Sequence, residues 1–417
     1  MADDTFREAY VVSADLVRDV EEALREGQTD EALALTERLH AADIADLTEA
    51  LPSEMRDALV HALGRELDPE MLAELDDQVL DEVLEQIEPE MLATHLAELD
   101  TDDAAEVLEE LDAAEQKRVL EALPPADREL VVKALSYPES SAGRMMQRNY
   151  VAVPEYWTVG QIIDWLRDSE DLPEEFYELF VVDPGHKPVG AVPLSRAMRT
   201  KRPIPVADIM SAEQKLFPVE MDQEEVAFHF EQYNLTSAAV IDANGRLIGQ
   251  ITIDDVVDVI EEEHEEDLHR LGGVKAEGDL FHSAGQTARR RSSWLLVNLF
   301  TAVLASITIA LFADTIEQMV ALAILMPIVA SMGGNAGMQT LAVTVRAIAT
   351  KELSSENFTK IILKEFVIGI LNGIIFAIIT GIVVLLWFRE INLTIIIAVS
   401  MILNMIVAGL FGILVPV

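Results

Sequence analysis

An uncharged polar segment lies inside an apolar stretch long enough to cross a membrane. Residues 319–345 contain no charged side chain, yet the sequence GGNAGMQ occupies positions 333–339. About 20 apolar residues cross roughly 30 Å of hydrocarbon, where unsatisfied polar groups are costly. Together with Pro327, the segment predicts a helix that bends and turns carbonyl and carboxamide oxygens toward a cavity for a hydrated ion. The alternative is close helix packing, with Asn335 and Gln339 hydrogen-bonding between helices; the cluster as a whole favours a pore.

A second set of oxygen ligands lies in the acidic run EEEHEEDLHR at residues 261–270. Like charges three or four residues apart on a helix repel each other, so solvent, salt or bound cations must offset them. Carboxylates are also the ligands that Mg²⁺ prefers in proteins. If cations bind here, the position of this helix depends on the concentration of divalent ions.

The negative charge of the chain is concentrated before residue 292. The chain has 30 Lys and Arg against 74 Asp and Glu; residues 292–417 contain 5 and 6 of these, which leaves 25 and 68 for the first 291. Such a field repels nucleic acid and attracts divalent cations. Adaptation to high salt explains the same composition and stays open. The absence of cysteine excludes disulfides and thiolate metal sites, and the N-terminus does not resemble a signal peptide.

Three further segments, 294–313, 366–388 and 391–417, are each long and apolar enough to cross a membrane. Basic residues precede the first span and crowd the connection between the second and third, which predicts a cytoplasmic N-terminal region. Gly369 and Gly373 form a GxxxG pattern, which predicts close helix contact in the third span.

The soluble region contains two different periodicities. From about Glu21 to Leu135, proline-marked breaks separate short amphipathic runs, which predicts a stack of short helices, a small α-solenoid. Residues 180–194 and 237–260 each read as strand, turn, strand and helix, which indicates a duplicated α/β module. Thr252 and Asp255 open the second helix; they could hold a ribose and phosphate, although helix capping is the favoured interpretation.

Several motifs in this order resemble the MgtE family of magnesium channels. They are the acidic helical repeat, the sequence YPESSAGRMM at 137–146, a tandem pair of cystathionine-β-synthase (CBS) modules, the acidic helix that ends EDLHRLG at 266–272, and P-x5-GGNxGxQ in the second span. The resemblance covers essentially the whole chain. It implies a multi-domain membrane protein with an α-solenoid-like helical domain (1–135), an α/β tandem CBS domain (136–260), an acidic connecting or plug helix with a linker (261–291), and an all-α transmembrane bundle (292–417).

The resemblance also implies the function and the residues that carry it. It implies a homodimeric Mg²⁺ channel of the cell membrane, gated when cytoplasmic Mg²⁺ binds between the helical domain, the CBS pair and the plug helix. Asn335 would contact hydrated Mg²⁺ in the pore, and ATP would bind the CBS pair at Thr252 and Asp255. The acids in the sensing role would be Glu70, Asp102, Glu106, Glu224, Asp255, Glu263, Glu266 and Asp267.

The sequence departs from the family pattern in three places. The family has five spans, with an essential Asp in the fifth, whereas this sequence reaches Val417 within or just after a fourth, so we expect it to be C-terminally incomplete. Asn234 stands where the pattern leads us to expect Asp. In the first CBS module, Pro193 and Arg196 occupy the positions that match Thr252 and Asp255, which argues against a nucleotide site there.

A membrane-anchored CBS module that senses a metal or an adenylate, without transport, is the alternative function. It explains the acidic surface and the CBS pair, but not the uncharged GGNAGMQ span. An enzyme is not expected, because the sequence shows no arrangement of nucleophile, base and oxyanion donors. Membrane lipid and divalent cations are therefore the expected partners, and nucleic acid is not.

Overall fold

The computed structural model describes residues 12–169, 172–173, 176–272, 284–349, 351–353 and 357–416. Two compact units are present, the first made mainly of residues up to Glu265 and the second mainly of residues from Ala284 onward. Each unit is considered by itself.

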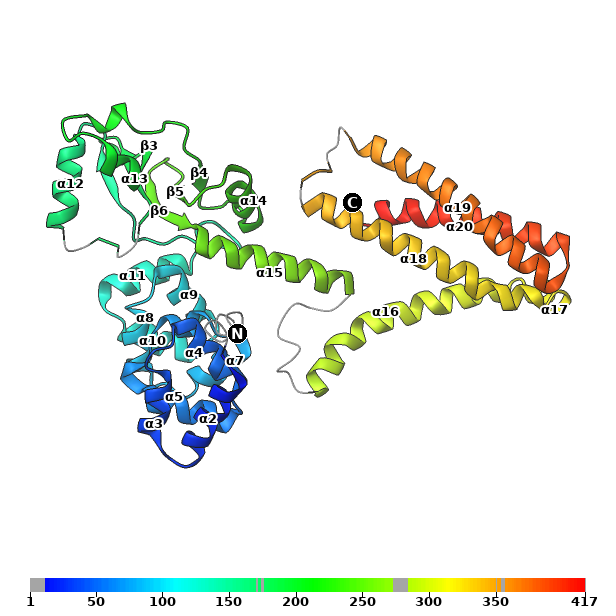
Figure 1. Ribbon diagram of the computed structural model, residues 1–417, viewed down its shortest axis with the longest axis horizontal. Helices are drawn as coiled ribbons and strands as arrows, with labels where there is room; N and C mark the ends of the chain where they lie inside the picture. The colour runs from blue at the N-terminus through cyan, green and yellow to red at the C-terminus, as the bar shows by residue number, and fades with distance from the viewer. Residues whose placement is uncertain are drawn as a thin grey trace, which may run out of the picture. The chain divides into compact units, whose positions relative to one another are not determined.

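Short helices stack to form the first part of the soluble unit, shown from blue to cyan in Figure 1. Helices pack against their next-but-one neighbours, such as α8 against α10 and α9 against α11, as the predicted repeat requires. Pro89 and Pro125 begin α8 and α11, where the missing N–H removes no helical hydrogen bond. The helices are α2 (Ala14–Arg25), α3 (Thr29–Thr36), α4 (Ala41–Ala50), α5 (Ser53–Leu63), η1 (Gly64–Glu66), α6 (Glu70–Ala73), α7 (Asp77–Leu84), α8 (Pro89–Leu96), α9 (Thr101–Glu109), α10 (Ala113–Ala122) and α11 (Pro125–Ala134).

Leucine, valine and alanine from all of these helices from α2 to α11 form one hydrophobic core. Leu47, Leu72 and Val107 are fully buried in it. Some of the acids have a purely local role: Asp112 caps α10 by accepting hydrogen bonds from the backbone N–H groups of Ala114 and Glu115. Only a subset of the many carboxylates therefore needs a further explanation.

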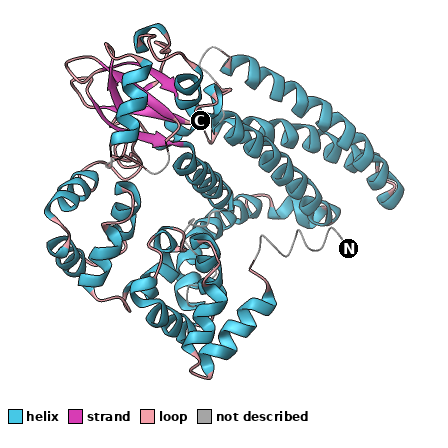
Figure 2. Cartoon of the chain, turned by 60° about the vertical axis from the view of Figure 1, so that its left-hand side comes forward, coloured by secondary structure: helices cyan, strands magenta, loops and turns pink. Residues whose placement is uncertain are grey.

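Two three-stranded sheets confirm the predicted duplication, and Figure 2 shows their strands in magenta within the mainly helical chain. In each sheet the first strand is parallel to the second, and the second is antiparallel to the third. The second and third strands pair in the same register 59 residues apart, since Val181 lies opposite Gly190 and Val240 opposite Gly249. The elements are β1 (Ala152–Pro154), α12 (Val159–Asp168), β2 (Glu178–Val182), β3 (Pro188–Pro193), α13 (Leu194–Arg199), η2 (Val206–Asp208), β4 (Leu216–Pro218), α14 (Gln223–Tyr233), β5 (Ser237–Ile241) and β6 (Leu247–Thr252).

In each module a methionine side chain packs against the glycine of the β-hairpin. A Cβ added at Gly190 would lie 2.8 Å from Met210 Sδ, and one added at Gly249 would lie 2.7 Å from Met146 Sδ. Residues next to these methionines form matching bridges to the third strands. The duplication thus includes the chain segment that enters each module, which the hairpin pattern alone did not reveal.

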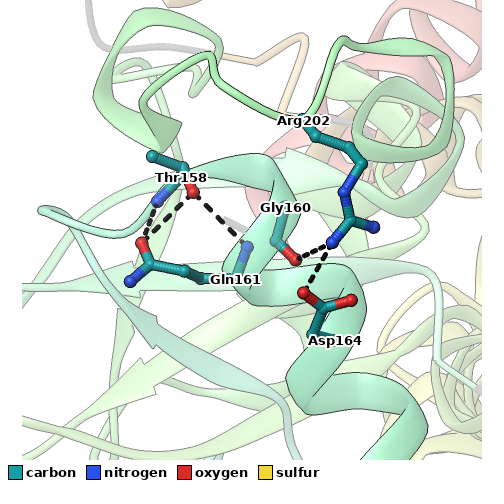
Figure 3. A network of polar contacts seen from close by, with 5 residues as sticks. All are labelled: Thr158, Gly160, Gln161, Asp164 and Arg202. Atoms are coloured by element: carbon teal, nitrogen blue, oxygen red, sulfur yellow. Dashed lines mark hydrogen bonds and ion pairs between the residues drawn. The ribbon is translucent and has the colours of Figure 1, made fainter.

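The first module fixes its helix α12 with the polar network in Figure 3. Thr158 caps the helix, and the Gln161 side chain accepts a hydrogen bond from the Thr158 backbone N–H. On the other side of the helix start, Arg202 donates to Gly160 O and to the carboxylate of Asp164. This network joins α12 to the loop that leads to the second module.

Helix α15 (Ile253–Gly272) continues directly from strand β6. The connecting helix, assigned from residue 261, is therefore the C-terminal part of a helix that begins within the second module. One rigid element thus carries both the first acids of that module and the acidic run.

The membrane unit contains four helices that are long and apolar enough to span a bilayer. Within it, α18 and α19 both pack along α20. The first span ends earlier than assigned, and a short helix follows it. The helices are α16 (Ala284–Ala310), α17 (Ala313–Gln318), α18 (Ala321–Ala349), α19 (Phe358–Phe388) and α20 (Ile391–Leu414).

The GxxxG prediction for α19 is confirmed. A Cβ at Gly369 would lie 3.0 Å from the Cα of Ile406, and one at Gly373 would lie 2.9 Å from the Cα of Ile402. The two helix backbones therefore approach too closely for any larger side chain at these positions.

Candidate functional site

Acidic side chains of α9 and of α15 form a cluster in the soluble unit. A hydrogen bond of 2.9 Å from Asn149 Nδ2 to Asp100 Oδ1 links the start of α9 to the segment that enters the CBS-like modules. We call the following residues the acidic interface, because each either has a pKa that is raised by the charge of another member or carries a charge that raises the pKa of another member: Asp100, Asp102, Asp103 and Glu106 of the α9 region, and Asp254, Asp255, Asp258 and Glu262 of α15.

Asp102 is the most deeply buried member of the acidic interface. The residue is 9% exposed, and neither carboxylate oxygen has a hydrogen-bond donor among the described residues. Burial and the nearby charges of Asp255 and Asp103 raise the pKa of Asp102 well above its ordinary value. A buried carboxylate without donors requires a proton or a cation, so this arrangement fits a positively charged ligand.

Three further carboxyl groups in the interface have strongly raised pKa values. Burial, with the charges of Asp255 and Asp100, raises the pKa of Asp103 to about 8. Loss of surrounding water, with the charges of Asp77 and Glu262, raises the pKa of Glu106 to about 7, although the outer part of this side chain reaches solvent.

For Asp255, burial and the charge of Asp254 raise the pKa to about 7. At neutral pH the carboxyl groups of the interface therefore lack enough nearby positive charge to balance their own.

Arg144 supplies one fixed positive charge beside this cluster. Its side chain is buried, and its Nη2 atom lies 2.7 Å from Glu109 Oε2 at the end of α9. The guanidinium also opposes the rise in the pKa of Glu106. Arg144 belongs to the SAGR segment between the helical domain and the first module, so it ties these two parts together electrostatically.

The remaining residues assigned to the sensor are only partly brought together. Glu70 lies at the start of α6, near Glu74. Burial raises the pKa of Glu74, and the charges of Asp258 and, more weakly, Glu70 raise it further. On α15, Glu263 accepts a hydrogen bond of 3.0 Å from Gln223, the residue next to Glu224.

Further along α15, Glu266 forms an ion pair with Arg270 on the same helix. The side chain of Asp267 lies outside the described side chains. The structure therefore places Asp102 near the charge of Asp255 and Glu106 near the charge of Glu262, and gives Glu266 a partner on its own helix.

No three carboxylate or imidazole groups among the described residues lie close enough together to hold one metal ion directly. Mg²⁺ loses its waters reluctantly and is commonly held through one or two carboxylates and several waters. The acidic interface therefore suits a hydrated ion that bridges carboxylates through its water shell.

Thr252 and Asp255 contact each other rather than an open pocket. Thr252 Oγ1 donates to Asp255 Oδ2 at 2.8 Å, and the Thr252 backbone N–H donates to the same oxygen at 3.3 Å. Gln147 Nε2 donates to both residues. This geometry is that of a helix start closed by its own side chains, as the capping interpretation predicts.

Helix α18 is unbroken through Pro327 and the GGNAGMQ segment. Its glycines divide between two faces. A Cβ at Gly333 would lie 2.2 Å from the side chain of Asn404 on α20, whereas a Cβ at Gly334 would meet no atom within 4 Å. Asn335, next to Gly334, is exposed.

The two interpretations of this segment thus apply to different faces of one helix. Gly333 and Gly337 face α20 and serve helix packing, since a Cβ added at Gly337 would lie 3.5 Å from Ala408 O of α20. Asn404 Nδ2 also donates to Val329 O of α18 at 2.6 Å. Asn335, on the other face, is available to line a path, and Pro327 leaves a helical carbonyl without its usual donor.

Comparison with known proteins supports this organisation. Residues 39–140 match the model of the MgtE intracellular N domain, 206–262 match the CBS domain, and 326–417 match the MgtE divalent cation transporter model. The magnesium transporter MgtE of Bacillus subtilis is 30% identical over 283 residues, and that of Thermus thermophilus is 33% identical over 283 residues. The chain belongs to the MgtE family.

The alignments cover 68% and 67% of this chain, and 63% and 62% of the two MgtE transporters. The matched region therefore spans less than two thirds of the length of these relatives. A crystal structure of the cytosolic domain of the Mg²⁺ channel MgtE in complex with ATP is 33% identical, with a TM-score of 0.54, and is covered over 99% of its length. The soluble part of a magnesium transporter is 26% identical, with a TM-score of 0.53 and 98% coverage.

The first CBS module of this MgtE-family chain has the same strand register as the second, although the matched CBS model covers only the second. Pro193 is the N-cap of α13 and Arg196 donates to the backbone carbonyl of Ile209. Both positions thus have structural roles in the first module.

Sequence reasoning missed several residues of the acidic interface. Asp103 and Asp258 of the interface, and Arg144 beside it, were not singled out, because their charges act on acids that are distant in the sequence. For Arg144, its place inside the SAGR motif was an available signal, since a lone Arg in a small-residue segment beside acidic helices is an obvious partner for them.

Proposed function

We propose that the protein transports Mg²⁺ across the membrane, and that Mg²⁺ bound at the acidic interface closes the path. The observation that carries the proposal is the division of α18 into a packing face and an exposed face with Asn335, in a segment that matches divalent cation transporters. The acidic interface supplies the regulatory half of the proposal.

The exposed face of α18 suits passage rather than storage of the ion. A neutral carboxamide and backbone carbonyls interact with the waters of hydrated Mg²⁺ without trapping it, whereas several carboxylates around a dehydrated ion would hold it strongly. Asn335 is therefore the residue that we place beside the transported ion.

The acidic interface suits a response to concentration. In the absence of a divalent ion, α9 and α15 repel each other through at least four carboxyl groups with raised pKa values. An ion with charge +2 reduces this repulsion far more than the same ionic strength of Na⁺. Because α15 is a continuous helix that leads out of the second module, its position would follow the occupancy of the interface.

The protein would act as a homodimer in the cell membrane, with the N-terminal region in the cytoplasm, as the basic residues around the spans indicate. ATP is a second proposed ligand of the CBS pair, since a related cytosolic domain was crystallised with ATP. In this chain ATP would have to displace Gln147 from Thr252 and Asp255. A shift in thermal unfolding on adding ATP, lost in Thr252→Val, tests that point.

Mg²⁺ uptake into liposomes, measured per folded dimer, tests the transport proposal. Asn335→Ala should reduce uptake, and Asn335→Asp should keep or tighten ion binding while slowing release. Gly334→Ala is the matched control, because the added methyl group meets no atom within 4 Å. Unchanged uptake per dimer in Asn335→Ala would remove this residue from the path.

The regulatory half has its own test. Millimolar Mg²⁺ should protect the soluble region from protease, and Na⁺ at equal ionic strength should not. Equal protection by Na⁺ would instead favour salt adaptation as the cause of the acidity. A membrane-anchored sensor without transport is the second candidate function, and Mg²⁺-specific protection without any uptake would favour it.

A further inference from the structure

A cavity in the membrane unit contains an acidic side chain that neither the pore assignment nor the sensor assignment uses. It has a volume of about 170 Å³ and lies between α18, α19 and α20. Its polar lining comes from Gln339 and Thr340 of α18 and from Glu365 and Asn372 of α19, and Gly409 of α20 closes one side.

Glu365 is the charged residue of this cavity. It is half-buried, and its Oε2 atom accepts a hydrogen bond of 3.3 Å from Thr340 Oγ1. Among the described residues Glu365 has no Lys or Arg partner within ion-pair distance. An acidic group at membrane depth normally pairs with a cation or faces a path for ions.

The position of the cavity along α18 relates it to Asn335. Gln339 follows Asn335 by four residues, about 6 Å or one helical turn along the axis. The basic residues Arg346, Lys351 and Lys360 follow on the same side of the membrane unit, which the positive-inside rule places in the cytoplasm. The cavity therefore lies at the cytoplasmic end of the path that begins at Asn335.

The chemistry of the lining selects a hydrated cation. Each polar lining side chain other than Glu365 offers a neutral oxygen, and Glu365 offers a carboxylate. A cavity of about 170 Å³ holds several waters, since one water needs only about 10–15 Å³ measured in this way. One carboxylate with several waters and neutral oxygens is a common environment for protein-bound Mg²⁺.

We propose that Glu365, with Thr340, Gln339 and Asn372, forms a binding site for a hydrated divalent cation at the cytoplasmic mouth of the path. The site deepens the proposed transport function and rests on it for the direction of the path. A single carboxylate attracts the ion, and the water shell keeps binding weak enough for release.

The absence of cysteine from the 417 residues allows a direct test in this chain. Ile368→Cys places one thiol in the lining of the cavity without removing a proposed ligand, and a small water-soluble thiol reagent reports whether the cavity is accessible. At a Mg²⁺ concentration about ten times the dissociation constant, roughly one site in eleven is free. Mg²⁺ should therefore slow modification of the thiol about tenfold, and Na⁺ at equal ionic strength should not.

Glu365→Gln in the Ile368→Cys background decides between ion binding and closure of the path. This variant removes the charge and keeps the size, so protection by Mg²⁺ should be lost. Glu390→Gln is the matched control, because this acid is exposed, lies beyond the other end of α19 and its side chain makes no capping hydrogen bond to α20; protection should persist there. Glu365→Asp should restore protection at higher Mg²⁺ concentration.

The outcomes separate the site from transport itself. Protection that persists in Glu365→Gln would show that closure elsewhere shields the thiol, and would overturn the site. Absence of protection in the Ile368→Cys parent would overturn it as well, and so would equal protection by Na⁺. Glu365-dependent protection in a protein that moves no Mg²⁺ into liposomes would support the site and reject the transport proposal.

Discussion

Asp103 offers a sensitive test of the acidic interface, because Asp103→Asn removes a charge with little change in shape. Burial and the charges of Asp255 and Asp100 raise the pKa of Asp103 from 3.8 to about 8. At pH 7 the interval above the ordinary value is 7 − 3.8 = 3.2, and at about 1.4 kcal/mol per pH unit this gives an upper limit of about 4 kcal/mol. Neighbouring carboxyl groups share protons and water relaxes around them, so we expect about half, about 2 kcal/mol.

Hydrogen exchange of the α9 amides measures this effect in the chain of 417 residues. In EDTA at pH 7, the Asn variant should reduce local opening by about 30-fold, since about 1.4 kcal/mol corresponds to a factor of ten. Added Mg²⁺ should then protect α9 less than in the wild type, because one bridging carboxylate is missing. Asp57→Asn on α5 is the control and should change neither result.

Faster exchange in the Asp103→Asn variant in EDTA would refute the reasoning, because it would mean that Asp103 stabilises the metal-free interface. An effect of equal size in Asp57→Asn would show that total charge matters rather than this position. Either result would favour adaptation to high salt as the cause of the excess of acidic residues.

Three further predictions follow from the same contacts. In EDTA, protection of α9 from protease should decrease as pH rises from about 5 to about 8. The acids whose folded pKa values are raised to about 7 and about 8 stabilise the protein when protonated and lose this contribution as they ionise. A flat profile of protease sensitivity over this range would contradict the prediction. Gly333→Ala should destabilise the membrane unit by about 1–3 kcal/mol in thermal unfolding, because its methyl group would collide with Asn404, whereas Gly334→Ala should be neutral; equal melting of the two variants would be contrary evidence. Arg144→Gln should loosen α9 without Mg²⁺ and be rescued by Mg²⁺, whereas loss that Mg²⁺ does not restore in hydrogen exchange would mean a packing role alone.

The periodicity of apolar residues was sufficient to predict the elements that pack against segments close to them in the sequence. The hairpins around Gly190 and Gly249, the proline-marked helices and the close contact at Gly373 all depend on local patterns, and the structure confirms them. The strands β1 and β4 escaped prediction because each has only three residues, too few for an alternating pattern to be recognised.

The site was harder to predict because it depends on contacts between distant elements. Asp103 is one of many acids on amphipathic helices, and only the meeting of α9 with α15 distinguishes it from the solvated ones. Similarly, Gly333 and Gly334 are adjacent in sequence, and only the rotation of α18 against α20 assigns the first to packing and leaves the second free. Helical periodicity shows which residues share a face, but not which face meets a neighbour.

The geometry of the acidic interface also limits how tightly it can bind an ion. A sensor of an abundant ion must release it when its concentration falls, which a preformed cage of several carboxylates would prevent. Among the described residues no such cage exists. In the proposed sensor the attraction would come instead from carboxyl groups such as Asp102 and Asp255, which would act on the ion through its water shell. Long-range attraction of this kind weakens as salt screens it. The Mg²⁺ concentration that closes the interface should therefore rise with ionic strength, so a chain with 25 basic and 68 acidic residues before position 292 can serve both salt tolerance and Mg²⁺ sensing with the same carboxylates.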